Sequence, residues 1–158
     1  IKDHQQTIIQ PCGNSNPYVI RNYTASDNYI FDMANYMVYL AGNFTPTNVE
    51  DRLNILISLF HESSYPRYKV HFQKLTNEVK RFKNISHMAE LAYPDPIFIR
   101  ENQIRIRTKK TKVVGNTVKP SETMYLLVDY KIIDGRFWII DMTELNQQEF
   151  KKVQKDEK

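Results

Sequence analysis

The sequence of 158 residues has one cysteine, four glycines and no long apolar run. The single cysteine, Cys12, excludes an intrachain disulfide and a zinc site built from several cysteines. With so few glycines, the chain has no glycine-rich loop of the kind that cradles phosphate groups. No segment of the sequence approaches the roughly 18 consecutive apolar residues of a membrane-spanning helix.

The residues that most often carry catalysis form no recognisable constellation. The histidines at positions His4, His61, His71 and His87 lack the spacing of paired metal ligands. Cys12 has no catalytic signature around it, which leaves a thiol catalyst unsupported. We therefore expect no catalytic residues, no metal and no cofactor.

Three carboxylates are candidates for acid–base chemistry, because some folds with helices on one face of a sheet hold a pocket between the two layers. The candidates are Asp32, Asp129 and Asp141. Asp129 alternates with the apolar residues of its strand and is predicted to point away from the core. Asp141 could point inward near a strand end, or take the commoner role of capping a backbone amide. A small-molecule-binding or isomerase-type enzyme is therefore the alternative function.

Size and charge restrict the function only weakly. The chain is long enough for one domain, which can bury roughly 70% of the surface of its unfolded chain. A net charge of +4 and a pI near 9.1 fit nucleic acid, an anionic membrane or an acidic partner and select none of them. The ten tyrosines and eight phenylalanines favour sheets and interfaces.

The first half of the sequence has helical periodicity. Apolar residues at spacings of three and four predict helices over residues 26–41, 47–60 and 65–83. A Gly-Asn pair ends the first of these helices. Thr47 and Glu50 have the spacing of a capping box at the start of the second helix.

The second half alternates with a period of two. Strands are predicted over residues 85–93, 97–100, 103–114, 124–133 and 137–140. Glu101-Asn102 and Asp134-Gly135 are typical of tight hairpin turns. This order predicts an α+β fold, with three N-terminal helices packed on a curved antiparallel sheet of about four strands. We expect Leu, Ile, Val and Phe side chains to fill the concave face of that sheet.

One candidate interaction surface is a stripe of tyrosines. Tyr29, Tyr36 and Tyr39 lie on one flank of the first predicted helix. Either residues 1–25 or a partner chain is expected to cover them. Large amphipathic rings suit a buried interface patch.

A second candidate surface is a strip of cations. Arg105, Arg107 and Lys109 alternate with Ile104 and Ile106, so they are predicted to project from the sheet face away from the helices. The simplest interpretation is a solvated edge strand whose cations discourage sheet-to-sheet pairing. A docking strip for an acidic partner is the second interpretation. Because aromatic residues are not interleaved with these cations, we expect no direct nucleic-acid binding.

Residues 39–48 read Y-L-A-G-N-F-T-P-T-N. This segment resembles the L-x-G-N-x-T-P-x-N segment of the TraE family of F-type conjugative type IV secretion systems. As in that family, an amphipathic helix precedes the segment, and two helices and a meander of strands follow it. Residues 7–11, T-I-I-Q-P, are similar to the family's stretch just after its membrane anchor.

TraE proteins are similar to the assembly-factor subunit of VirB-type secretion systems. The resemblance implies a periplasmic domain with a nuclear transport factor 2-like fold, held to the inner membrane of a Gram-negative bacterium by one transmembrane helix. It also implies a scaffold for secretion, conjugation and pilus assembly that self-associates and contacts other subunits of the inner membrane and periplasm. The family has no catalytic residues to transfer.

The resemblance also divides the chain. Residues 1–25 are expected to form an arm that follows a removed membrane anchor, and residues 26–145 the periplasmic domain. Residues 146–158 are expected to form a polar C-terminal tail that contains a short helix. The Asn-Pro-x-Gly turn of the VirB-type relatives is not evident in this sequence, so their interface cannot be transferred residue by residue.

Overall fold

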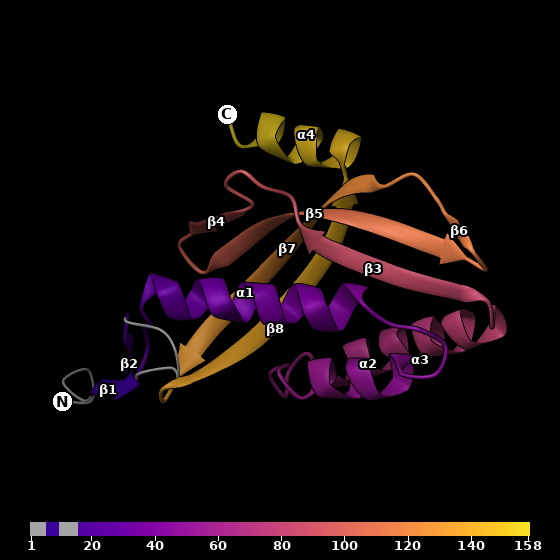
Figure 1. Cartoon of the computed structure of the whole chain (residues 1–158). Helices are drawn as coiled ribbons and strands as arrows, with labels where there is room; N and C mark the ends of the chain where they lie inside the picture. The colour runs from indigo at the N-terminus through magenta and orange to yellow at the C-terminus, as the bar shows by residue number, and fades with distance from the viewer. Residues whose placement is uncertain (1–5, 10–15) are drawn as a thin grey trace.

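A computed structural model of the chain describes residues 6–9 and 16–158. His4, Cys12 and residues 10 and 11 of the T-I-I-Q-P segment lie outside these ranges. The described ranges contain α-helices, a small two-stranded sheet and a larger six-stranded sheet (Figure 1). The predicted α+β class is confirmed.

Among the described residues, three helices precede the larger sheet in the sequence, and one helix follows it. They are α1 (Asp27–Gly42), α2 (Val49–Ile57), α3 (Tyr65–Arg81) and α4 (Gln147–Asp156). The first three correspond to the predicted N-terminal helices, with ends that differ by a few residues. α4 is the short helix predicted in the polar tail.

The strands are β1 (Gln6–Ile9), β2 (Tyr18–Arg21), β3 (Ile85–Leu91), β4 (Ile97–Arg100), β5 (Gln103–Val114), β6 (Thr117–Val118), β7 (Glu122–Ile133) and β8 (Arg136–Asn146). β1 pairs with β2. The other strands form one antiparallel sheet in the order β3-β5-β7-β8, and the short strands β4 and β6 also pair with β5. The main path thus has the predicted number of strands, while the comparison with nuclear transport factor 2 stays a prediction.

Helices cover both faces of the larger sheet (Figure 1). Ile104, Ile106 and Val128 are buried on the inner face, in one core with residues of α1, α2 and α3. On the opposite, outer face, Phe150 of α4 stacks on Tyr125 of β7 with ring centroids 4.0 Å apart. The sheet therefore lies between a thick helical layer and a single short helix.

The N-terminal segment is attached to the β7–β8 hairpin. Ile20 of β2 is buried, and Gly135 donates its backbone N–H to the Asn22 carbonyl at 3.0 Å. Asp134 and Gly135 have φ angles of 50° and 77°, the positive values that a two-residue type I′ turn requires. The predicted Asp-Gly hairpin is confirmed.

The joint between α1 and α2 closes the free edge of β3. Phe44 exchanges two backbone hydrogen bonds with His87, at 2.9 and 3.1 Å. The Asn43 side chain accepts a hydrogen bond from the Ala89 N–H at 3.1 Å and donates one to the Ala89 carbonyl at 2.9 Å. The amide of Asn43 thus acts as a peptide group of a neighbouring strand, and it satisfies an edge that would otherwise be open.

Gly42 permits this close approach of α1 to β3. A Cβ atom on Gly42 would lie 2.4 Å from the Cβ of Ala89, well inside van der Waals contact. The G-N-F part of the segment that resembles the TraE family therefore has a structural explanation. Each of its residues fits the end of α1 to the edge of β3.

The predicted capping box of Thr47 and Glu50 is wrong. α2 begins at Val49, and the Asn48 side chain accepts a hydrogen bond from the backbone N–H of Thr45 at 2.7 Å. Glu50 instead pairs with Lys80 of α3. The hydrogen bond from Lys80 and the positive charge of this lysine both lower the pKa of Glu50. The lysine thus competes with the start of α2 for this carboxylate.

The linker between α2 and α3 covers the free edge of β8 in a similar way. Ile139 donates its N–H to the Leu59 carbonyl at 2.8 Å, and its own carbonyl accepts from the His61 N–H at 2.9 Å. The β7–β8 register shifts here, because Asp129 and Tyr130 pair with Asp141 and Ile139 and leave Ile140 without a partner on β7. This is a β-bulge on an edge strand.

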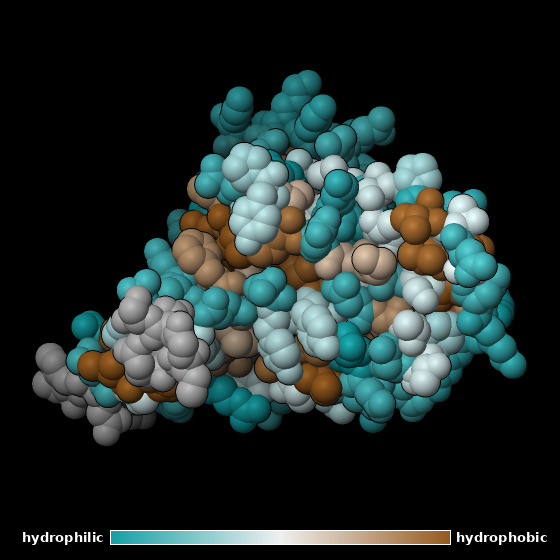
Figure 2. Space-filling model, in the orientation of Figure 1, coloured by the Kyte–Doolittle hydropathy of each residue, from teal (hydrophilic) through white to brown (hydrophobic). Residues whose placement is uncertain are grey.

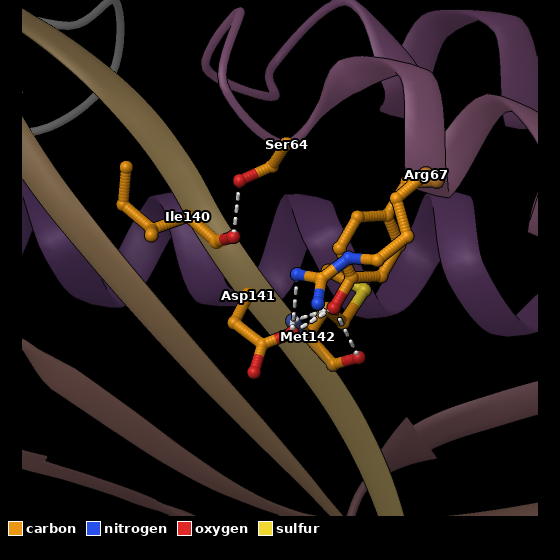
Figure 3. Close-up of polar contacts among 6 residues, drawn as sticks. Ser64, Arg67, Ile140, Asp141 and Met142 are labelled. Carbon is orange, nitrogen blue, oxygen red and sulfur yellow. Dashed lines mark hydrogen bonds and ion pairs between the residues drawn. The ribbon is translucent and has the colours of Figure 1, made fainter.

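Side chains from the start of α3 complete the cover over the bulge (Figure 3). The Ser64 hydroxyl donates to the Ile140 carbonyl at 2.6 Å. The Tyr68 hydroxyl accepts from the Met142 N–H at 2.9 Å and donates to the Asp141 carboxylate. Both interhelix linkers therefore bond to a sheet edge, one on each side of the sheet.

We expect Gly42→Ala to lower the free energy of unfolding by about 1–3 kcal/mol, because the added methyl group overpacks against Ala89. Ala89→Gly removes the opposing Cβ atom, so the double variant should recover part of that loss. Urea unfolding of the wild-type chain, both single variants and the double variant measures the coupling. A Gly42→Ala loss that is the same with and without Ala89 would contradict the contact.

Candidate interaction surfaces

The tyrosine stripe of α1 is divided by its neighbours. Tyr29 is partly buried because Tyr18 of β2 packs against it edge-on, with ring centroids 5.2 Å apart. Burial raises the pKa of Tyr29. Tyr36 and Tyr39 are 41% and 48% exposed. Of the two covers considered for the stripe, the N-terminal segment covers only the Tyr29 end.

A groove runs beside the exposed tyrosines, between α1 and β3. Its lining includes Tyr36, Tyr39, Leu91 of β3 and Tyr93 of the β3–β4 loop, and Tyr93 is 76% exposed. The guanidinium of Arg52 lies 4.3 Å from the centre of the Tyr39 ring. Aromatic rings with polar edges are typical of protein–protein contacts. We call this surface the tyrosine groove.

The cation strip lies on the outer face of the sheet, but the chain itself uses part of it. The Arg105 side chain is only 12% exposed and pairs with Glu157, just beyond α4. Arg107 donates to two backbone carbonyls of the β3–β4 loop. Lys109 is exposed. Of the three cations, Lys109 is therefore the most accessible to a partner.

Sequence reasoning missed the contact between Arg105 and the C-terminal residues. Glu157 belongs to a stretch with the composition of a solvated tail, yet Arg105 and Arg100 both pair with its carboxylate. Hydrogen bonding to Arg105 is the main cause that lowers the pKa of Glu157. The available clue was Phe150, an aromatic residue in a polar stretch, which is buried against Tyr125.

A larger groove, of about 890 Å³, opens between α3 and the inner face of the sheet. Phe72 and Leu75 of α3 and Leu126 of β7 are among its apolar lining residues. Lys110 and Glu144, which also line it, form an ion pair with 3.0 Å between nitrogen and oxygen. Apolar side chains therefore fill much of the concave face, as expected, but not the part beside α3. α3 packs mainly on α2, and part of the sheet beside it stays open.

None of the three candidate carboxylates lines this groove. Asp32 of α1 accepts a hydrogen bond from the Tyr18 hydroxyl. Asp129 accepts one from the Gln103 side chain at 2.8 Å, on the outer face as predicted. Neither is among the residues that line the groove.

Asp141 belongs to the cover of the β8 edge (Figure 3). It accepts a hydrogen bond from the Tyr68 hydroxyl and one from the Met142 N–H, the latter at 3.1 Å. Arg67 lies 3.4 Å from the same carboxylate oxygen. Asp141 thus bonds to a backbone amide, the commoner of the two roles considered for it, and the three carboxylates do not converge.

The geometry therefore offers two grooves and a strip of cations, and a comparison with known families identifies the chain. The family described as TraE protein matches residues 1–144.

The chain belongs to the TraE family.

Solved structures of other proteins share the fold of this TraE-family chain. The VirB8 protein of Agrobacterium tumefaciens has a TM-score of 0.64 at 12% identity, over 77% of this chain and 92% of that one. A TraE protein in complex with 2-chloroisonicotinic acid has a TM-score of 0.63 at 8% identity, over 80% and 100%. The periplasmic domain of DotI has a TM-score of 0.60 at 11% identity, over 75% and 94%.

None of the curated proteins matches this chain. Among residues 6–9 and 16–158, the helices are all too short or too polar to cross a membrane. The assignment to TraE therefore rests on the family match, and the solved structures agree with it in fold.

His87 links the groove beside α3 to the joint that closes β3. Its ring is partly buried and packs against Phe44, with centroids 5.1 Å apart. Burial is the main cause that lowers the pKa of His87, and the charges of Lys112 and Lys110 lower it further, while Glu78 opposes them. Folding therefore favours the neutral imidazole.

We expect the stability of the chain to fall below about pH 6.5, the unperturbed pKa of histidine. Because the pKa of His87 is lower in the folded state, its favourable contribution is present above the unfolded pKa and is lost as the pH falls through the folded pKa. His87→Gln should flatten this part of the stability profile. Urea unfolding between about pH 7.5 and pH 5 compares the two chains. Parallel profiles would mean that other groups cause the acid sensitivity.

Proposed function

We propose that this TraE-family chain is a periplasmic assembly subunit of a type IV secretion apparatus for conjugative transfer, and that it acts through protein–protein contacts rather than catalysis. Membership of the TraE family supports an assembly role in the secretion apparatus. The fold shared with VirB8 supports the same role, and the fold shared with the periplasmic domain of DotI supports the compartment.

The exposure of the tyrosine groove is the observation that carries the proposal. Tyr36, Tyr39 and Tyr93 are large amphipathic side chains that remain open to solvent beside one another. Such rings bury well against a partner and are enriched at the centres of interfaces. We propose self-association through this groove, with Lys109 and the neighbouring arginines as a secondary contact for other secretion subunits.

The finer topology is part of the proposal. The full-length chain is anchored in the inner membrane of a Gram-negative bacterium, with residues 1–25 as the arm and residues 26–145 as the body of the periplasmic domain. Residues 146–158 form an appendage to this body, packed on the outer face of the sheet. Anchoring raises the effective concentration of the domain, so weak contacts suffice. Direct contact with nucleic acid is not part of the function.

The groove beside α3 favours one alternative, a small-molecule-binding or isomerase-type function. Its volume of about 890 Å³ is in the range of ligand pockets. Its Lys110 and Glu144 are already paired with each other, and none of the three candidate aspartates lines it. These features favour the assembly role.

We expect Tyr36→Glu to weaken self-association, because a charged carboxylate would have to be buried in the interface. Tyr65→Glu is the matched control, since Tyr65 is similarly exposed, at 38%, but lies on α3. Analytical ultracentrifugation over a range of concentrations compares the three chains, and circular dichroism checks the fold. Unchanged association of a folded Tyr36→Glu variant would remove the tyrosine groove as the interface.

A further inference from the structure

In the described part of the chain, β4 leaves an open backbone edge on the larger sheet. β3 and β4 lie end to end along the same side of β5. The α1–α2 joint bonds to His87 and Ala89 of β3, and the α2–α3 linker bonds to β8. Among residues 6–9 and 16–158, no segment other than β5 hydrogen-bonds to the backbone of β4.

The hairpin between β4 and β5 determines which backbone groups of β4 point outward. Arg100 and Gln103 flank a two-residue turn, so they form a hydrogen-bonded pair, and such pairs recur at every second residue. The Pro96 carbonyl accepts from the Arg107 N–H at 2.7 Å, which continues this pattern. The N–H and C=O groups of Ile97 and Ile99 therefore point away from β5. On β3, His87 and Ala89 have the same spacing and also point their N–H and C=O groups outward. There, Phe44 and Asn43 form hydrogen bonds to these groups.

The side chains beside this edge are apolar. Phe98, on the outer face, is 59% exposed, and Tyr93, just before β4, is 76% exposed. Ile97 and Ile99 are partly buried against the core on the inner face. Figure 2 shows apolar surface gathered over this part of the molecule, next to α1. Exposed backbone groups flanked by apolar side chains are what an added strand needs.

Cations surround the same edge on the outer face. Arg100 follows Phe98 by two residues on β4, and Arg105 lies opposite Phe98 on β5. Both pair with the single carboxylate of Glu157, which leaves these three side chains with a net positive charge. Arg107 lies at the other end of β4, where its guanidinium meets backbone carbonyls that do not neutralise its charge. A strand that carried carboxylates at these two ends would be complementary, whereas two copies of β4 paired with each other would bring like charges together.

We propose that the edge of β4 binds an extended acidic segment of another secretion subunit as an additional strand. An apolar residue of that segment lies beside Phe98, and carboxylates two residues before and after it face Arg100 and Arg107. Main-chain bonds to Ile97 and Ile99 supply affinity, and these side chains supply specificity. The identity of the partner as a secretion subunit rests on the proposed function, while the strand site rests on the edge itself.

A blocked peptide of sequence Ser-Glu-Val-Val-Val-Glu-Ser is the probe, and its counterpart with lysine in place of glutamate is the control. Titration followed by NMR should shift the amides of Ile97 and Ile99 and slow their hydrogen exchange. The lysine peptide should bind more weakly, and added salt should weaken the acidic peptide. Shifts confined to other residues, or equal binding of the two peptides, would overturn the proposal.

Ile99→Pro tests the main-chain contact, because proline removes an outward N–H and is tolerated on edge strands at such positions. Ile99→Ala is the matched control, since it loses similar side-chain packing and keeps the N–H. We expect the proline variant to bind the acidic peptide at least about fivefold more weakly than the alanine variant, the effect of one net hydrogen bond. Equal binding by the two variants would exclude strand addition.

Two further observations separate this site from self-association. Tyr36→Glu should leave peptide binding unchanged. This result would show that peptide binding at β4 does not depend on self-association. Amides of Ile97 and Ile99 that become protected as the protein concentration rises, without any peptide, would overturn the proposal in favour of a second copy as the occupant. Absence of peptide binding with self-association intact would remove only the strand site.

Discussion

Asn43 bonds to both backbone groups of Ala89, and the neighbouring Phe44 bonds to both backbone groups of His87. These contacts fix the C-terminal end of α1 against the edge of β3. They therefore determine which flank of α1 is covered by the sheet. Gly42 allows them by bringing the helix end against the Ala89 methyl group. With the α2–α3 linker bonded to β8, the helical layer is held at both sides of the sheet, and its inner residues are buried between the two attachments.

The same arrangement decides what remains available to other molecules. The two interhelix linkers bond to β3 and β8, so neither of them covers β4. The flank of α1 that carries Tyr36 and Tyr39 faces solvent rather than the sheet. The tyrosine groove and the β4 edge therefore lie next to each other. Both result from the way in which the helical layer packs on the sheet. The groove beside α3 has the same origin, since α3 is held through α2 and the β8 bulge and does not press on the sheet along its whole length.

Local pattern predicted the parts of the fold that burial on one face decides. The alternation of Ile104 and Ile106 with Arg105 and Arg107 gave the correct faces, because a strand with one buried face has a fixed register. The capping box of α2 failed because Glu50 finds Lys80, a residue thirty positions away whose approach no local pattern encodes. The partial burial of Arg105 by Glu157 and the division of the tyrosine stripe by Tyr18 could not be predicted for the same reason. Interaction sites depend on such long-range contacts more than the fold does.

The attachment of the N-terminal segment to the β7–β8 turn has a mechanical consequence. Gly135 and Asn22 join the first described strands to the far end of the longest hairpin, independently of α1. A pulling force applied to β1 is therefore shared between the helix and the tip of that hairpin. The strands of this hairpin extend from the turn toward α4. Tension on the N-terminal strands is therefore transmitted along the sheet to the end of the molecule where α4 packs.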